Sequence, residues 1–136
     1  MKKLFILLIL AAIAAAAWVR LAPSPAEDWH VDPKVTADQD GANQVRRRIE
    51  GGEDVFRRLD HIILATPRTD LLAGSPEEGR VTYITRSKWM GFPDYTTIQL
   101  GDGVVELWSR SRFGQSDMGV NRARAEGWLQ ELSRGE

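Results

Sequence analysis

The sequence contains no cysteine among its 136 residues. This absence excludes a disulfide framework, a thiolate metal site, a cysteine nucleophile and a lipid-modified N-terminal cysteine. Histidine is nearly as scarce, since only His30 and His61 are present, and the sequence therefore predicts no metal site. It also lacks a glycine-rich phosphate loop and a nucleophile-elbow motif, so we assign no catalytic residue and expect no cofactor.

An excess of positive charge is also missing. The formal net charge is -1, and the chain beyond residue 20 carries 15 basic and 19 acidic side chains. A net acidic body argues against non-specific binding of nucleic acid. The length leaves room for one domain with a modest hydrophobic core.

The N-terminus is strongly apolar. Lys2 and Lys3 precede residues 4–19, which contain no polar side chain, and Arg20 follows. The alanine run in this segment favours a cleaved secretory signal, whereas Trp18 beside Arg20 favours a retained membrane anchor. We favour a single inner-membrane span with the C-terminal domain in the periplasm, because the two lysines should stay cytoplasmic. Secretion to the periplasm after signal cleavage is the alternative.

The composition divides the chain into three parts. Residues 1–22 form the anchor or signal segment. Residues 23–43 contain three of the six prolines and no regular periodicity, and we call them the tether. Residues 44–136 should form the folded domain.

Periodicity predicts an α+β domain. A helix is predicted at residues 53–66, strands at 69–73, 80–88, 95–100 and 104–112, and a closing helix from residue 119 or 121 to 132. Residues 45–49 alternate weakly, which is compatible with a further short strand. Short connections favour a small antiparallel meander of three to four strands, flanked by an N-terminal and a C-terminal helix.

The last predicted strand has two distinct faces. Val105 and Leu107 lie on the face that we expect to pack on the core, whereas Trp108, Arg110 and Arg112 should stand together on the outer face. We therefore predict that Arg110 and Arg112 are dispensable for folding.

Four arginines occur within the seventeen residues 108–124. Arginine stays charged, so such a density requires anions from the chain or from a ligand. Arg122 and Arg124 fall in the first turn of the closing helix, where the helix dipole disfavours cations. Asp94 and Asp117 are the candidate partners.

Two stretches carry a resemblance to a known family. They read Thr-Arg-Ser-Lys-Trp-Met-Gly-Phe-Pro-Asp-Tyr at residues 85–95 and Ser-Arg-Ser-Arg-Phe-Gly-Gln-Ser-Asp-Met-Gly-Val-Asn-Arg-Ala-Arg at residues 109–124. The chain resembles the bacterial and plastid family called domain of unknown function 1499. The resemblance implies an envelope protein with a small α+β domain and assigns no activity. Many members have a second acid where this chain has Tyr95, so a paired-carboxylate mechanism has no support.

Three interpretations of the arginines follow. The first is a non-catalytic binding or scaffolding module whose arginines bind an anionic lipid head group or phosphate. Its ligand-binding residues would be Arg86, Arg110, Arg112, Arg122 and Arg124. The second is a hydrolase that uses Asp94 or Asp117. The third is internal pairing, in which Asp94, Asp117 and Asn121 are structural and hold the arginines in place; we favour it over a ligand site, because structural ion-pair networks are common.

Overall fold

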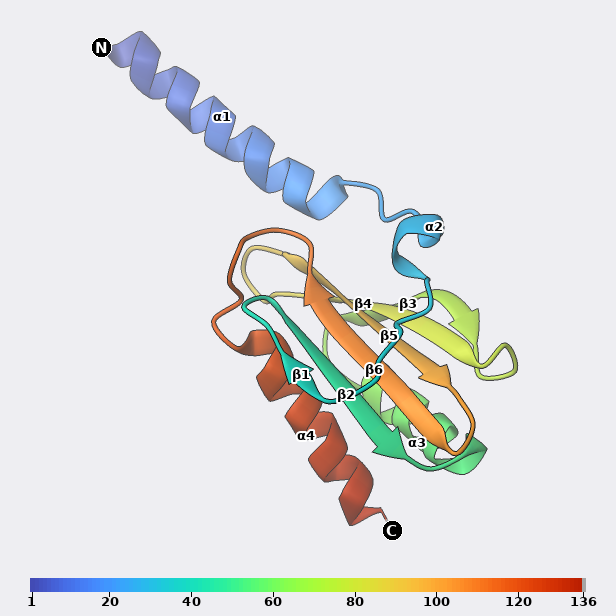
Figure 1. The fold of residues 1–136 in the computed structure, drawn as a ribbon. Coiled ribbons are helices and arrows are strands. Elements are labelled where there is room, and N and C mark those ends of the chain that lie inside the picture. Colours follow the sequence, from blue (N-terminus) through green and yellow to red (C-terminus); the bar gives the residue numbers. More distant parts are fainter. Residues whose placement is uncertain (136) are drawn as a thin grey trace.

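The computed structural model describes residues 1–135 of the chain. Within this range the chain forms four helices and six strands (Figure 1). They are α1 (Lys2–Leu21), α2 (Ala26–Trp29), β1 (Gln39–Asp40), β2 (Gln44–Glu50), α3 (Glu53–Leu64), β3 (Thr69–Ser75), β4 (Arg80–Arg86), β5 (Pro93–Leu100), β6 (Val104–Ser111) and α4 (Val120–Arg134).

Helix α1 projects away from the rest of the molecule (Figure 1). It buries none of its residues, and its mean hydropathy is 2.5. Within residues 1–135 it is the one helix that is long and apolar enough to cross a membrane. A retained anchor and a cleaved signal both fit such a helix.

The strands form one antiparallel sheet in the order β1-β2-β6-β5-β4-β3. The predicted meander is present as β3 to β6, but the expected number of three to four strands was wrong. Strand β2, whose alternation is weak because of three consecutive arginines, pairs with β6 along its whole length. The tether then adds the two-residue β1 to the edge.

The core lies between one face of the sheet and helices α3 and α4. Phe56, Leu59 and Ile63 of α3 are fully buried there. Trp128 of α4 is 4% exposed and donates its indole N–H to Thr66 Oγ1 over 2.8 Å. Burial of such apolar side chains is the main stabilising contribution to a small domain.

The tether crosses the opposite face of the sheet between α2 and β1 (Figure 1). Its Trp29 ring stacks on Tyr95 with centroids 3.8 Å apart, and Val35 is 2% exposed. The backbone N–H of Val35 donates to Glu106 Oε1 over 2.5 Å. The sheet is therefore covered on both faces.

The predicted faces of β6 are confirmed, but the second face is not open. Val105 and Leu107 are fully buried on the helix side. Arg110 points to the tether side and is only 5% exposed, because Trp29 lies over it. The expectation that Arg110 stands on an outer surface was therefore wrong.

Candidate functional site

The sheet separates the five arginines that the sequence singled out. Arg86 and Arg110 belong to the tether face, and Arg112 follows at the end of β6 with bonds to the same side. Arg122 and Arg124 lie on α4, which packs on the other face. The five side chains thus fall into two groups.

On the helix face, Arg124 pairs with Asp94. The Arg124 Nη1 atom is 3.1 Å from Asp94 Oδ2, and both side chains are largely buried. Ser111 Oγ donates to the other carboxylate oxygen over 2.7 Å. Both Asp94 oxygens are thereby occupied by other groups of the protein.

Asp117 holds the start of α4 and does not pair with an arginine. Its carboxylate accepts hydrogen bonds from the backbone N–H groups of Gly119 (2.8 Å) and Asn121 (3.1 Å). The fully buried Asn121 side chain also donates to the Asp117 carboxylate over 2.7 Å. The side-chain oxygen of Asn121 accepts a hydrogen bond from Ser109 Oγ over 2.7 Å. A carboxylate in this place satisfies N–H groups that lack a partner within the helix.

Arg122 is exposed and forms ion pairs on the surface. Its Nε is 3.0 Å from Glu126 and 3.6 Å from Asp40. The hydrogen bond with Glu126, followed by the charge of Asp40, raises the pKa of Arg122 above its ordinary value. A solvated pair of this kind contributes little to stability.

Arg110 is buried, and no carboxylate in the described part of the chain pairs with it. Its guanidinium lies 3.9 Å from the Trp108 ring centroid and 5.6 Å from that of Trp29. It donates to the Trp29 carbonyl over 2.6 Å and to Thr97 Oγ1 over 2.9 Å, while its Nε has no hydrogen-bond partner among residues 1–135. Burial, aided by the nearby Arg46 charge, lowers the pKa of Arg110 to about 9.

Arg112 also serves the tether. It donates to the Pro23 carbonyl over 2.7 Å and lies 5.3 Å from the Phe113 ring centroid. Together with Arg110 it fastens the tether through backbone carbonyls and aromatic rings, which are neutral partners.

Arg86 belongs to a different surface, where other cations gather. A cleft of about 440 Å³ lies between the end of α1, the start of β3 and the β4–β5 loop. We call it the basic cleft. Its lining residues are Arg20, Arg68, Asp70, Arg86, Ser87, Lys88 and Gly91.

Three of the four cations of the basic cleft donate hydrogen bonds to backbone carbonyls. Arg86 Nη1 donates to Gly91 O over 2.9 Å, Arg68 Nε to Arg86 O over 3.0 Å, and Arg20 Nη2 to Trp89 O over 2.6 Å. None of its four cations forms an ion pair within residues 1–135. The cleft therefore carries an uncompensated positive charge.

Sequence reasoning found Arg86 but did not place Arg68 and Lys88 beside it. Arg20 was interpreted only as an interfacial residue of the anchor. Arg20, Arg68 and Arg86 are far apart in sequence, and antiparallel pairing of β3 with β4 brings Arg68 to the backbone of Arg86. The one feature of the sequence that could have indicated the basic cleft is the basic stretch Arg86-Ser-Lys88 at the end of a strand.

This geometry does not support the alternative interpretation as a hydrolase that uses Asp94 or Asp117. Asp94 is held by Arg124 and Ser111, and Asp117 by the start of α4. His30 contacts Thr82 and Glu78 on the tether face. Among the residues that the structure describes, no group of three potential ligands could hold a metal ion.

A small antiparallel sheet with two helices on one face, a docked tether on the other and an apolar leading helix defines an α+β domain. A family model described as "Protein of unknown function (DUF1499)" matches residues 20–132. The chain belongs to this family, and the match includes the tether as well as the sheet and both packing helices. A sequence search finds no match among curated proteins.

Proposed function

We propose that the protein is a non-catalytic binding module, anchored in a membrane by α1, whose basic cleft binds a phosphate group. The anionic head group of a lipid is the favoured source of this phosphate, and free phosphate has the same chemistry. The observation that carries the proposal is a cluster of four cations, which form no ion pair with the residues that the structure describes, beside the end of a membrane-length helix. The domain is proposed to lie in the periplasm, because the cationic Lys2 and Lys3 before the span should stay on the cytoplasmic side.

The position of the cleft supports a lipid ligand. Arg20 lies in the last turn of α1, and its side chain lines the cleft. If α1 spans the bilayer, the cleft lies close to the head groups of the outer leaflet. Arginine and lysine are the usual partners of phosphate, and Arg68 and Arg86 each keep guanidinium N–H groups that make no hydrogen bond within the described chain.

This proposal retains one of the five arginines that the sequence suggested as ligand-binding residues. Arg86 remains as a ligand-binding residue and is joined by Arg20, Arg68 and Lys88. Arg110 and Arg112 are proposed to fasten the tether, and Arg124 to hold Asp94. The single acid of the cleft, Asp70, has no ion pair in the described range and leaves the net charge positive.

Thermal unfolding of the full chain in lipid nanodiscs tests the proposal. Phosphatidylglycerol mixed into phosphatidylcholine nanodiscs should raise the melting temperature by about 5 °C, since a ligand that binds only the folded state stabilises it. The double variant Arg86→Gln/Lys88→Gln should lose this rise. Arg80→Gln, at the other end of β4, is the matched control and should keep it.

A second arm distinguishes the two sources of phosphate. Inorganic phosphate is added to nanodiscs of pure phosphatidylcholine, where no anionic lipid is present. A rise in the melting temperature in this arm alone would indicate free phosphate as the ligand. Equal responses of the double variant and the Arg80→Gln control to both additions would refute the anion site.

A further inference from the structure

The loop between β4 and β5 exposes a cluster of large apolar side chains. Trp89 is 78% exposed, Met90 47% and Phe92 40%. The loop is nevertheless ordered by its own hydrogen bonds, because Phe92 N donates to Ser87 Oγ over 2.9 Å and Gly91 N to Ser87 O over 3.2 Å. A structured loop with an exposed tryptophan at its tip is typical of an interaction surface.

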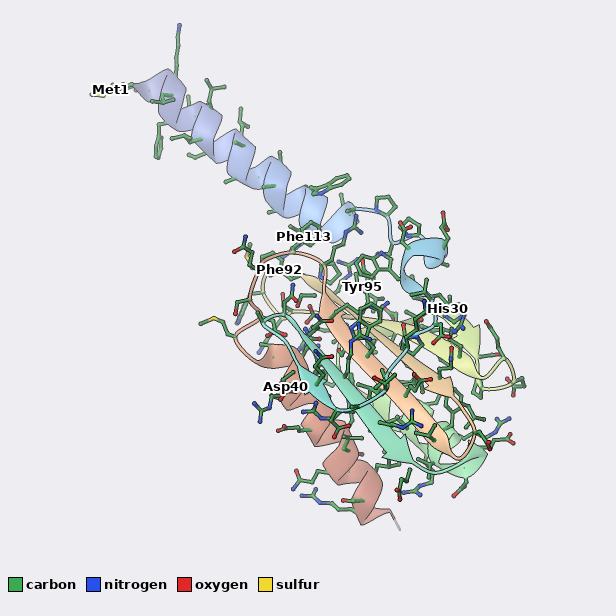
Figure 2. All side chains as sticks on the ribbon, in the orientation of Figure 1. Met1, His30, Asp40, Phe92, Tyr95 and Phe113 are labelled. Carbon is green, nitrogen blue, oxygen red and sulfur yellow. The ribbon has the colours of Figure 1, made fainter. Side chains whose placement is uncertain are left out.

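This loop is fixed to the end of α1. Arg20 donates from Nη2 to Trp89 O over 2.6 Å and from Nε to Met90 O over 3.2 Å. A Cβ atom at Gly91 would lie 2.9 Å from Arg20 Cγ, so glycine permits this close approach. Figure 2 shows Phe92 at the end of the domain nearest to α1.

We infer that this loop inserts its apolar tip into the interfacial layer of the bilayer that holds α1. The inference rests on the proposed anchoring by α1. A helix of 20 residues spans about 30 Å, which is the thickness of the hydrocarbon core of a bilayer. When the first turn of α1 lies at one membrane–water interface, its last turn therefore lies at the other. The loop bonded to that last turn then lies at the same depth.

The chemistry of the loop fits an interface between lipid and water. Tryptophan prefers the head-group level, where its apolar ring and polar N–H find different surroundings. The Lys88 ammonium lies 5.2 Å from the Trp89 ring centroid and provides a cation beside the apolar tip. Together with Trp18, which is 56% exposed on α1, Trp89 gives the domain a second point of contact with the membrane.

Site-directed spin labelling tests the insertion, and the cysteine-free chain allows single labels. The variants are Trp89→Cys in the loop, Ile9→Cys in α1 and Asp102→Cys in the β5–β6 hairpin. The hairpin lies at the opposite end of the sheet because successive antiparallel loops alternate between ends. Vesicles of pure phosphatidylcholine keep the result independent of the anionic ligand of the basic cleft.

The labels are compared by their collisions with oxygen, which enriches in lipid, and with a water-soluble nickel complex. We expect the labels at positions 9 and 89 to collide more often with oxygen, and the label at position 102 to collide more often with the nickel complex. A label at position 89 that behaves like that at position 102, while position 9 stays in lipid, overturns the insertion and leaves the anchor intact. A water-exposed label at position 9 overturns the proposed anchor and the insertion with it.

Discussion

The two aspartates that the sequence singled out have different structural roles. Asp94 compensates the largely buried charge of Arg124, whereas Asp117 accepts backbone N–H groups at the start of α4. Asp94→Ala would leave the guanidinium without its carboxylate and should lower the free energy of unfolding by about 3 kcal/mol. Asp117→Ala should lower it by roughly 1 kcal/mol, as expected for the loss of a helix cap.

Urea titrations of the full chain in a mild detergent measure both free energies, with tryptophan fluorescence, to which the buried Trp128 contributes, as the signal. Arg57→Ala, which removes only the exposed ion pairs of Arg57 with Glu53 and Glu77, is the control and should change stability by less than about 0.5 kcal/mol. Equal losses for the two aspartate variants would contradict the distinction between a buried pair and a cap.

At the scale of elements, the tether behaves as part of the folded domain. Trp29 stacks on Tyr95, and its carbonyl accepts a hydrogen bond from the buried Arg110. Trp29→Ala should therefore loosen the tether and speed tryptic cleavage after Lys34 by about tenfold, which corresponds to about 1.4 kcal/mol of easier local opening.

Time courses of limited proteolysis, read by mass spectrometry, provide the rate at this bond. Trp89→Ala is the matched control, because that ring lies in the β4–β5 loop and is 78% exposed, whereas the Trp29 ring stacks on Tyr95. An unchanged rate in Trp29→Ala would mean that the stack does not hold the tether on the sheet.

At the scale of the whole molecule, the apolar helix and the two lysines before it predict the orientation. Alkaline phosphatase fused after Glu136 should be active, because the enzyme folds only outside the cytoplasm. A fused cytoplasmic reporter should be inactive. The opposite pattern would reverse the proposed orientation, and a mature chain that lacks residues 1–17 would favour the cleaved signal over the anchor.

The sequence by itself determined the elements with strong local signals. The period of residues 53–66 marked α3, the alternation of residues 104–112 marked β6 and its two faces, and Pro67 marked a helix end. The motif at residues 109–124 indicated the family, and the match over residues 20–132 confirms it. These features depend on neighbours within a few residues, which a sequence displays directly.

Tertiary structure decided what covers each face. The pairing of β2 with β6 joins residues more than 50 positions apart, and the docking of Trp29 over Arg110 joins residues 81 apart. Strand alternation fixes which side chains share a face, but it carries no information about which distant segment packs there. For this reason the four arginines of residues 108–124 lie on opposite faces of the sheet, and Arg86 lies beside Arg20 and Arg68 instead.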